Sequence, residues 1–236
     1  MEADVDIQHD WQWNEIQQVG TDYADVSEVE RYDERMNQLR DSSVEDSAIL
    51  NRLGLVEDSS ILEIGTGTGH FARHSAKAGY RVSAIDVSPV MLEYARRRAE
   101  SQGLKIEFHH AGFLTMPFEP ETFEAAVSVM ALHHLPDAWK AIALDNVHRV
   151  LKPGGLFFLR DVVFEWDQRD HRSCFDEFVN SCGEDMRKEA ARHVACEYST
   201  LDWIMRGLLE RAELSAIARE STGKGFMQYL CRKSPR

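Results

Sequence analysis

The sequence has little cysteine and no clustered metal ligands. Its four cysteines are Cys174, Cys182, Cys196 and Cys231, and they form neither a C-x-x-C pair nor a zinc-finger spacing. This spacing favours free buried thiols over a disulfide framework. His171, His193 and the cysteines at 174, 182 and 196 hint at a thiol or metalloid substrate, but their spacing forms no ligand set, so the sequence predicts no metal site.

Long apolar runs and targeting signals are also missing. No apolar stretch approaches the ~20 residues that span a bilayer. Residues 1–4 lack the basic and apolar regions of a signal peptide. We therefore expect a cytoplasmic protein with no membrane partner. At 236 residues, 43% hydrophobic and 28% charged, the chain has the composition of an ordinary globular domain.

Basic residues are scarce in the first quarter of the chain. Residues 1–60 contain 16 acidic and 4 basic side chains, whereas residues 61–236 contain 24 and 23. The net charge of -13 therefore arises almost entirely in the N-terminal quarter. Such a segment repels phosphate backbones, so we expect no nucleic acid partner. An acidic solvated face is the simpler use of these charges.

Three glycines at alternate positions follow an apolar segment at residues 61–64. Gly65, Gly67 and Gly69 lack the spacing of a dinucleotide fingerprint, whose third glycine would fall on His70. A phosphate-binding P-loop also fails, because it requires glycine and lysine at positions 70 and 71. A buried strand ending in such a turn lets the backbone approach a ligand and points N–H groups at it. The segment therefore predicts a ligand site that fits neither of these two phosphate-binding patterns.

Strand-like and helix-like segments alternate from residue 61 onward. The expected strands are 61–64, 81–86, 106–110, 125–130, 156–160, 214–218 and 226–231. The expected helices are 47–53, 70–78, 89–103, 138–151 and one that follows a cap at Thr200 and runs to about residue 212. Parallel strands need long crossovers, so we predict an α/β fold with a doubly wound, mostly parallel seven-stranded sheet and a C-terminal antiparallel hairpin.

Asp86 ends the second of these strands, 21 positions after Gly65. Ligands of open α/β sheets bind beyond the carboxyl ends of the strands. A carboxylate about 20 residues after a glycine turn can accept hydrogen bonds from both hydroxyls of a ribose. We predict that role for Asp86, with a solvated aspartate as the alternative. Arg160 and Asp161 are expected either to face a substrate or to form ion pairs.

Four further segments, read with the glycine loop, resemble a known family. They are Met116-Pro117-Phe118, Phe123-Glu124, Leu132-His133-His134 and the turn at 151–155. In order and spacing they resemble the class I S-adenosylmethionine-dependent methyltransferases, specifically their small-molecule branch. The resemblance covers about residues 60–160. It departs at Gly112, where members usually have an aspartate that holds the adenine amine, and at Glu124, which is usually aspartate.

The resemblance implies S-adenosyl-L-methionine as the cofactor. The residues expected to bind it are Glu63, Gly65, Thr66, Gly67, Gly69, Asp86, Val87, Met91, Gly112, Phe113, Met130 and Tyr32. Tyr32 belongs to an amphipathic helix predicted from apolar residues at 26, 29, 32, 36 and 39, a helix that relatives use as a lid. Core packing is the alternative role for this tyrosine.

His133 and His134 are the expected catalytic residues. By the resemblance they border the transferred methyl group, where a histidine of near-neutral pKa can take a proton from the acceptor. Adjacent residues on a strand point to opposite faces, so at most one of the two is expected to meet the substrate. The alternative is that one imidazole only orients the loop.

The predicted organisation has four parts. They are an acidic N-terminal cap or lid (1–55), a cofactor-binding core (56–161), an insertion over the cleft (162–199), and a C-terminal helix and hairpin (200–236). The predicted function is methyl transfer to a small-molecule acceptor through an O, N, C or S nucleophile, by a monomer or a homodimer. The alternatives are a non-catalytic S-adenosylmethionine-binding module and a nicotinamide-dependent oxidoreductase, which His70 disfavours.

Overall fold

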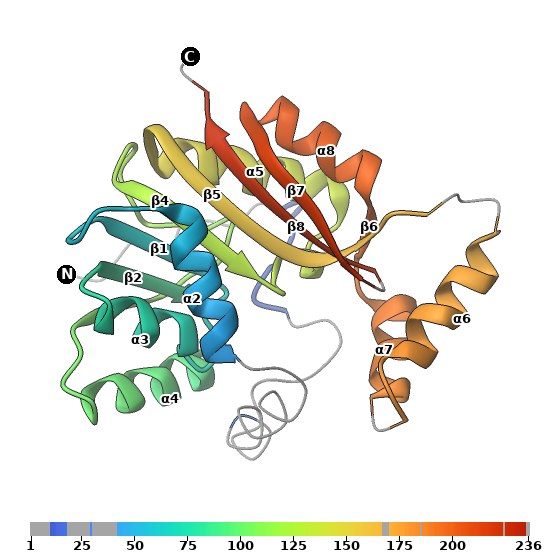
Figure 1. Cartoon of the computed structure of the whole chain (residues 1–236), viewed down its shortest axis with the longest axis horizontal. Helices are drawn as coiled ribbons and strands as arrows, with labels where there is room; N and C mark the ends of the chain where they lie inside the picture. The colour runs from blue at the N-terminus through green and yellow to red at the C-terminus, as the bar shows by residue number, and fades with distance from the viewer. Residues whose placement is uncertain are drawn as a thin grey trace.

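The computed structural model of the protein has a central sheet with helices on both faces (Figure 1). It describes residues 10–17, 29, 42–166, 170–184, 186–223 and 225–234. The predicted N-terminal helix and its Tyr32 lie outside the described residues, apart from Val29, which is buried.

Within the described residues, seven strands form one continuous sheet, and an eighth short strand pairs with the end of one inner strand. The strands are β1 (Ser60–Ile64), β2 (Arg81–Asp86), β3 (Ile106–His110), β4 (Phe123–Val129), β5 (Leu151–Phe164), β6 (Thr200–Leu201), β7 (Leu214–Gly223) and β8 (Phe226–Lys233). Their order is β3-β2-β1-β4-β5-β8-β7, with β6 paired to β5. Strands β1 to β5 pair in parallel, and β8 runs antiparallel to β5 and β7. The predicted doubly wound α/β fold with its C-terminal hairpin is confirmed.

Helices cover both faces of this sheet. The helices of the described residues are α2 (Ser42–Leu53), α3 (His70–Lys77), α4 (Pro89–Glu100), α5 (Asp137–Val150), α6 (His171–Ser181), α7 (Arg187–Cys196), α8 (Asp202–Arg211) and the 3₁₀ turn η1 (Leu132–His134). Helices α2 and α3 pack on the face to which Ile61 points, and α5 and α8 pack on the face of Leu62. Successive strand residues point to opposite faces, and because helices cover both faces, β1 is buried at every position. Within the described residues, no helix combines the length and apolarity needed to cross a membrane.

Two of the differences from the prediction concern β5 and the strand β6 that pairs with it. Strand β5 runs unbroken from residue 151 to residue 164, through the turn expected at 152–155, because its pairing with β4 continues past an irregularity between Phe123 and Ala125. Its far end is extended by pairing with β6 and β8. Thr200 does not cap the following helix. It lies in β6, where its hydroxyl donates to Asp137 at 3.0 Å, and α8 begins at Asp202.

Helices α6 and α7 stand beyond the carboxyl end of β5 (Figure 1). They are attached through an apolar cluster of Val162 and Phe164 from β5, Phe178 from α6 and Ala190 from α7. The rings of Phe164 and Phe178 meet edge to face, with centroids 5.3 Å apart. Just after α7, the backbone N–H of Tyr198 donates to the His133 carbonyl at 2.9 Å. The end of α7 therefore lies directly against η1.

Candidate functional site

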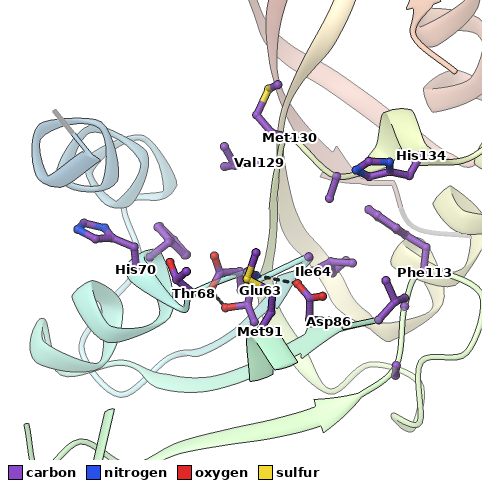
Figure 2. Close-up of a pocket in the computed structure, with 18 of the residues that line it drawn as sticks. Glu63, Ile64, Thr68, His70, Asp86, Met91, Phe113, Val129, Met130 and His134 are labelled. Atoms are coloured by element: carbon purple, nitrogen blue, oxygen red, sulfur yellow. Dashed lines mark hydrogen bonds between the residues drawn. The ribbon is translucent and has the colours of Figure 1, made fainter. Parts of the chain in front are cut away.

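A pocket lies at the carboxyl ends of β1, β2 and β4, where open α/β sheets bind their ligands. Eleven of the predicted site residues line it: Glu63, Gly65, Thr66, Gly67, Asp86, Val87, Met91, Gly112, Phe113, Met130 and His134. Figure 2 shows Glu63 and Asp86 close together, with Phe113 and His134 on the side opposite His70. The predicted residues Gly69 and His133 do not belong to this lining.

The three glycines of the loop have different surroundings. All adopt left-handed backbone conformations, with φ of 75° at Gly65, 53° at Gly67 and 73° at Gly69. A Cβ at Gly65 would collide with the Cβ of Ala131, and one at Gly69 would lie 2.9 Å from the Cβ of Ala95 on α4. A Cβ at Gly67 would meet nothing within 4 Å. Close packing therefore requires glycine at two positions, whereas Gly67 borders open space in the pocket.

Asp86 organises the loop with both of its carboxylate oxygens. One oxygen accepts the N–H of Gly67 at 2.7 Å, and the other accepts the N–H of Ser88 at 2.8 Å. Burial raises the pKa of Asp86, and these two hydrogen bonds oppose that effect. Each carboxylate oxygen has a further lone pair. Asp86 can therefore hold the loop in place and also accept hydrogen bonds from ligand hydroxyls.

Glu63 is a second buried acid on the floor of the pocket. Its side chain accepts a hydrogen bond from the Thr66 hydroxyl at 2.6 Å. Burial raises the pKa of Glu63 to about 8, and the nearby carboxylates of Asp46 and Asp86 act in the same direction. A cationic ligand group beside Glu63 would favour its ionised form. The pair of buried acids suits a ligand with hydroxyls and positive charge.

The two adjacent histidines separate into different environments. Both lie in η1 rather than on a strand, and only His134 lines the pocket. His133 is 5% exposed, with Nδ1 2.5 Å from Asp161 and Nε2 3.2 Å from Glu197. Burial by itself would lower the pKa of His133, but the two carboxylates raise it to about 9. Burial and the charge of His133 lower the pKa of His134 to about 4. Neither value is the near-neutral one expected from the sequence.

Helix α2 forms a pocket wall that the sequence analysis did not assign to the site. Its contributing residues are Ser42, Glu45, Asp46 and Ile49. Asp46 lies 2.6 Å from Nδ1 of His70, the first residue of α3. Glu45 lies 2.7 Å from the guanidinium of Arg160, so this arginine takes the ion-pair role. A short helix with scattered acids carries no sequence signal for a pocket.

Glu15 was also missed, and it enters the pocket beside Gly112. Its carboxylate accepts the N–H of Leu114 at 3.0 Å and the hydroxyl of Thr115 at 2.7 Å. Burial raises the pKa of Glu15, and these hydrogen bonds oppose the shift. A Cβ at Gly112 would collide with this carboxylate. A carboxylate therefore lies where the resemblance led us to expect an aspartate, but it comes from 97 positions earlier in the chain.

The region around the pocket matches known proteins. The family model of a methyltransferase domain matches residues 61–155. An uncharacterized methyltransferase of Geobacillus sp. (strain WCH70) is 32% identical over 179 residues, which cover 74% of this chain and 77% of that protein. The demethylmenaquinone methyltransferase of Thermus thermophilus is 38% identical over 108 residues, which cover 45% of this chain and 46% of that enzyme.

Similarity of fold extends further than similarity of sequence. The structure of a putative methyltransferase from Bacillus halodurans aligns with a TM-score of 0.65 and 18% identity, covering 81% of this chain and 100% of that one. At this identity the alignment shows a shared fold alone. Several curated relatives match over only 34% to 46% of their own length. The Geobacillus relative is matched over most of its length, and by that match and the domain model this chain belongs to the class I S-adenosylmethionine-dependent methyltransferase family.

Proposed function

We propose that this protein transfers a methyl group from S-adenosylmethionine to a small-molecule acceptor. The observation that carries the proposal is that Gly67, Asp86, Glu63 and His134 converge on one pocket. These groups suit a nucleoside joined to a cationic amino acid, because they offer close backbone approach, hydroxyl acceptors and negative charge. The loop lacks both phosphate-binding patterns, which agrees with a cofactor that carries no phosphate.

In this proposal the donor lies along the glycine loop. Open space at Gly67 admits the methionine and sugar portion, and Asp86 accepts hydrogen bonds from the ribose hydroxyls. Glu63 faces the positive charge of the donor from the floor of the pocket. Phe113 and the carboxylate of Glu15 border the adenine, whose exocyclic amine donates to Glu15. Glu15 thereby replaces the side chain that Gly112 lacks.

The acceptor end of the pocket is assigned to His134 and Met130. The sulfonium already activates the methyl group, so catalysis requires mainly in-line placement of the acceptor, with a base where the acceptor carries a proton. His134 faces the acceptor because it lines the pocket, and His133 acts as a positioning residue behind it. A small-molecule acceptor, rather than a nucleic acid, is supported by the acidic net charge and by the Thermus relative, which is named for a demethylmenaquinone.

Thermal unfolding with excess ligand tests the donor class. Saturation at ~100 times the dissociation constant adds about 2.7 kcal/mol, which should raise the midpoint by roughly 5 to 10 °C. We expect this rise with S-adenosylmethionine and S-adenosylhomocysteine and none with nicotinamide dinucleotides. The rise should disappear in Asp86→Ala and persist in Asp145→Ala, an exposed aspartate on α5. A rise with dinucleotides, or the absence of a rise with every ligand tested, would overturn the proposal.

A test of the role of Glu15 requires two ligands that differ from each other only at the adenine amine. We expect S-adenosylhomocysteine to bind about 10 to 150 times tighter than its analogue with purine in place of adenine, which lacks only this amine, because an amine donating to a carboxylate contributes about 1.5 to 3 kcal/mol. Glu15→Ala should abolish this preference, and Glu119→Ala, at an exposed position, should retain it. Equal preference in the wild type and in Glu15→Ala would remove Glu15 from adenine recognition.

Turnover separates an enzyme from a binding module. Product S-adenosylhomocysteine measured across a panel of small nucleophiles should appear with the wild type. His134→Ala should lose turnover while keeping the ligand-induced rise in unfolding temperature, because His134 faces the acceptor rather than the donor in this proposal. If the wild type binds the donor but methylates no nucleophile in the panel, the result would favour the non-catalytic module.

A further inference from the structure

A second cluster of polar side chains lies behind the pocket, between η1 and the end of α7. Nε2 of His133 is 3.2 Å from Glu197, and Nδ1 of His193 is 2.5 Å from the same carboxylate oxygen. One donor atom from each residue lies within 4.8 Å of the other two. None of the three side chains is more than 14% exposed. Two imidazoles and one carboxylate thus converge on a small buried volume.

The remaining nitrogen of each imidazole is held by a further side chain. Asp161, which is 1% exposed, lies 2.5 Å from Nδ1 of His133 and accepts the backbone N–H of the same residue at 3.1 Å. The hydroxyl of Ser199 lies 2.6 Å from Nε2 of His193. Both rings are therefore oriented so that their other nitrogens point to Glu197. Histidines that bind metals are usually oriented in this way, by a carboxylate or another polar group on the nitrogen that does not coordinate.

We propose that His133, His193 and Glu197 bind a divalent transition-metal ion of the zinc class. Two histidines and one carboxylate form a ligand set that such ions favour. Bonds of about 2.0 Å to a tetrahedral ion place ligand atoms roughly 3.3 Å apart, close to the observed separation of His133 and Glu197. On metal binding, the distance between Nδ1 of His193 and the carboxylate oxygen of Glu197 would have to increase by roughly 0.8 Å. Three protein ligands leave one position for water or another oxygen ligand.

The charges of the cluster also fit a dication. Glu197 and the buried Asp161 together carry two negative charges, which balance one divalent ion held by neutral imidazoles. The nearby buried cation Lys140 is occupied elsewhere, by Asp137 and the carbonyl of Tyr198. Sequence spacing could not indicate this site, because His133 and His193 are 60 positions apart and belong to different elements. A metal-free network of ion pairs that ties α7 to the sheet is the competing explanation.

Titration of the metal-free full-length protein with Zn²⁺, followed by calorimetry, tests the proposal without any methyl donor. We expect one equivalent to bind, with Mg²⁺ failing to compete because it prefers oxygen ligands. Co²⁺ should bind at the same site and develop the visible absorption of a low-coordinate ion. Glu197→Gln and His193→Ala should each weaken binding more than about 100-fold, since each removes a ligand. His171→Ala, at an exposed position on α6, should leave it unchanged.

Ser199→Ala keeps all three ligands and removes only the partner of His193. We expect it to weaken Zn²⁺ binding by about 10-fold or more while preserving stoichiometry, as loss of an orienting partner does. This variant keeps the proposal testable if a ligand substitution prevents folding. Absence of saturable Zn²⁺ binding, or binding that survives both Glu197→Gln and His193→Ala, would overturn the proposal in favour of the ion-pair network. Either result is independent of whether S-adenosylmethionine binds.

Discussion

Substituting Gly65 and Gly67 with alanine should separate packing from ligand binding. Both residues have positive φ, so alanine at either position incurs a left-handed backbone cost of about 1 kcal/mol. At Gly65 the new methyl group also collides with Ala131, and such overpacking costs a further ~1 to 3 kcal/mol. At Gly67 the methyl group meets no atom within 4 Å. Gly65→Ala should therefore lose about 3 kcal/mol of stability and Gly67→Ala about 1 kcal/mol.

Two assays on the same pair of variants check this reasoning. For a chain of this size, the midpoint temperature of thermal unfolding should fall by roughly 6 to 12 °C in Gly65→Ala and by roughly 2 to 4 °C in Gly67→Ala. Calorimetric titration with S-adenosylhomocysteine should show that Gly67→Ala loses affinity although it loses little stability, because its methyl group occupies the space of the ligand. For Gly65→Ala the loss of affinity should be smaller relative to the loss of stability. Equal destabilisation of the two variants, or wild-type affinity in Gly67→Ala, would refute the assignment of the loop.

Two further predictions concern buried polar groups. Because the pKa of Glu63 is raised from 4.5 to about 8, the folded state keeps a proton that the unfolded chain releases between these values. Stability should therefore fall as pH rises through this window, by up to about 1.4 kcal/mol per pH unit, and Glu63→Gln should flatten that slope in urea unfolding at several pH values. Tyr229→Phe removes a buried hydroxyl that donates to Asp202 at 2.8 Å, so it should cost about 1.5 to 3 kcal/mol; an unchanged unfolding midpoint would show that this bond adds no stability.

The sequence by itself determined the fold class and the glycine loop. The bounds of β2 and β3 agree with the prediction, because apolar runs bounded by turn residues are local signals. The positions of Gly65, Gly67 and Asp86 at the ends of successive parallel strands follow from the same alternation, since the carboxyl ends of those strands meet at one edge. The extent of β5 was not predictable in this way, because β6 and β8 pair with it from distant parts of the chain.

Tertiary structure decided what each polar side chain contacts. His133 and His134 are neighbours in the sequence, but η1 directs only one to the pocket and leaves the other between Asp161 and Glu197. Glu15 reaches Gly112 from a distant segment. Such contacts leave no periodic pattern, because they depend on how separate elements pack rather than on the conformation of any one segment. Local sequence therefore specifies where the backbone presents a site, and the packing of distant elements specifies its charges and its hydrogen bonds.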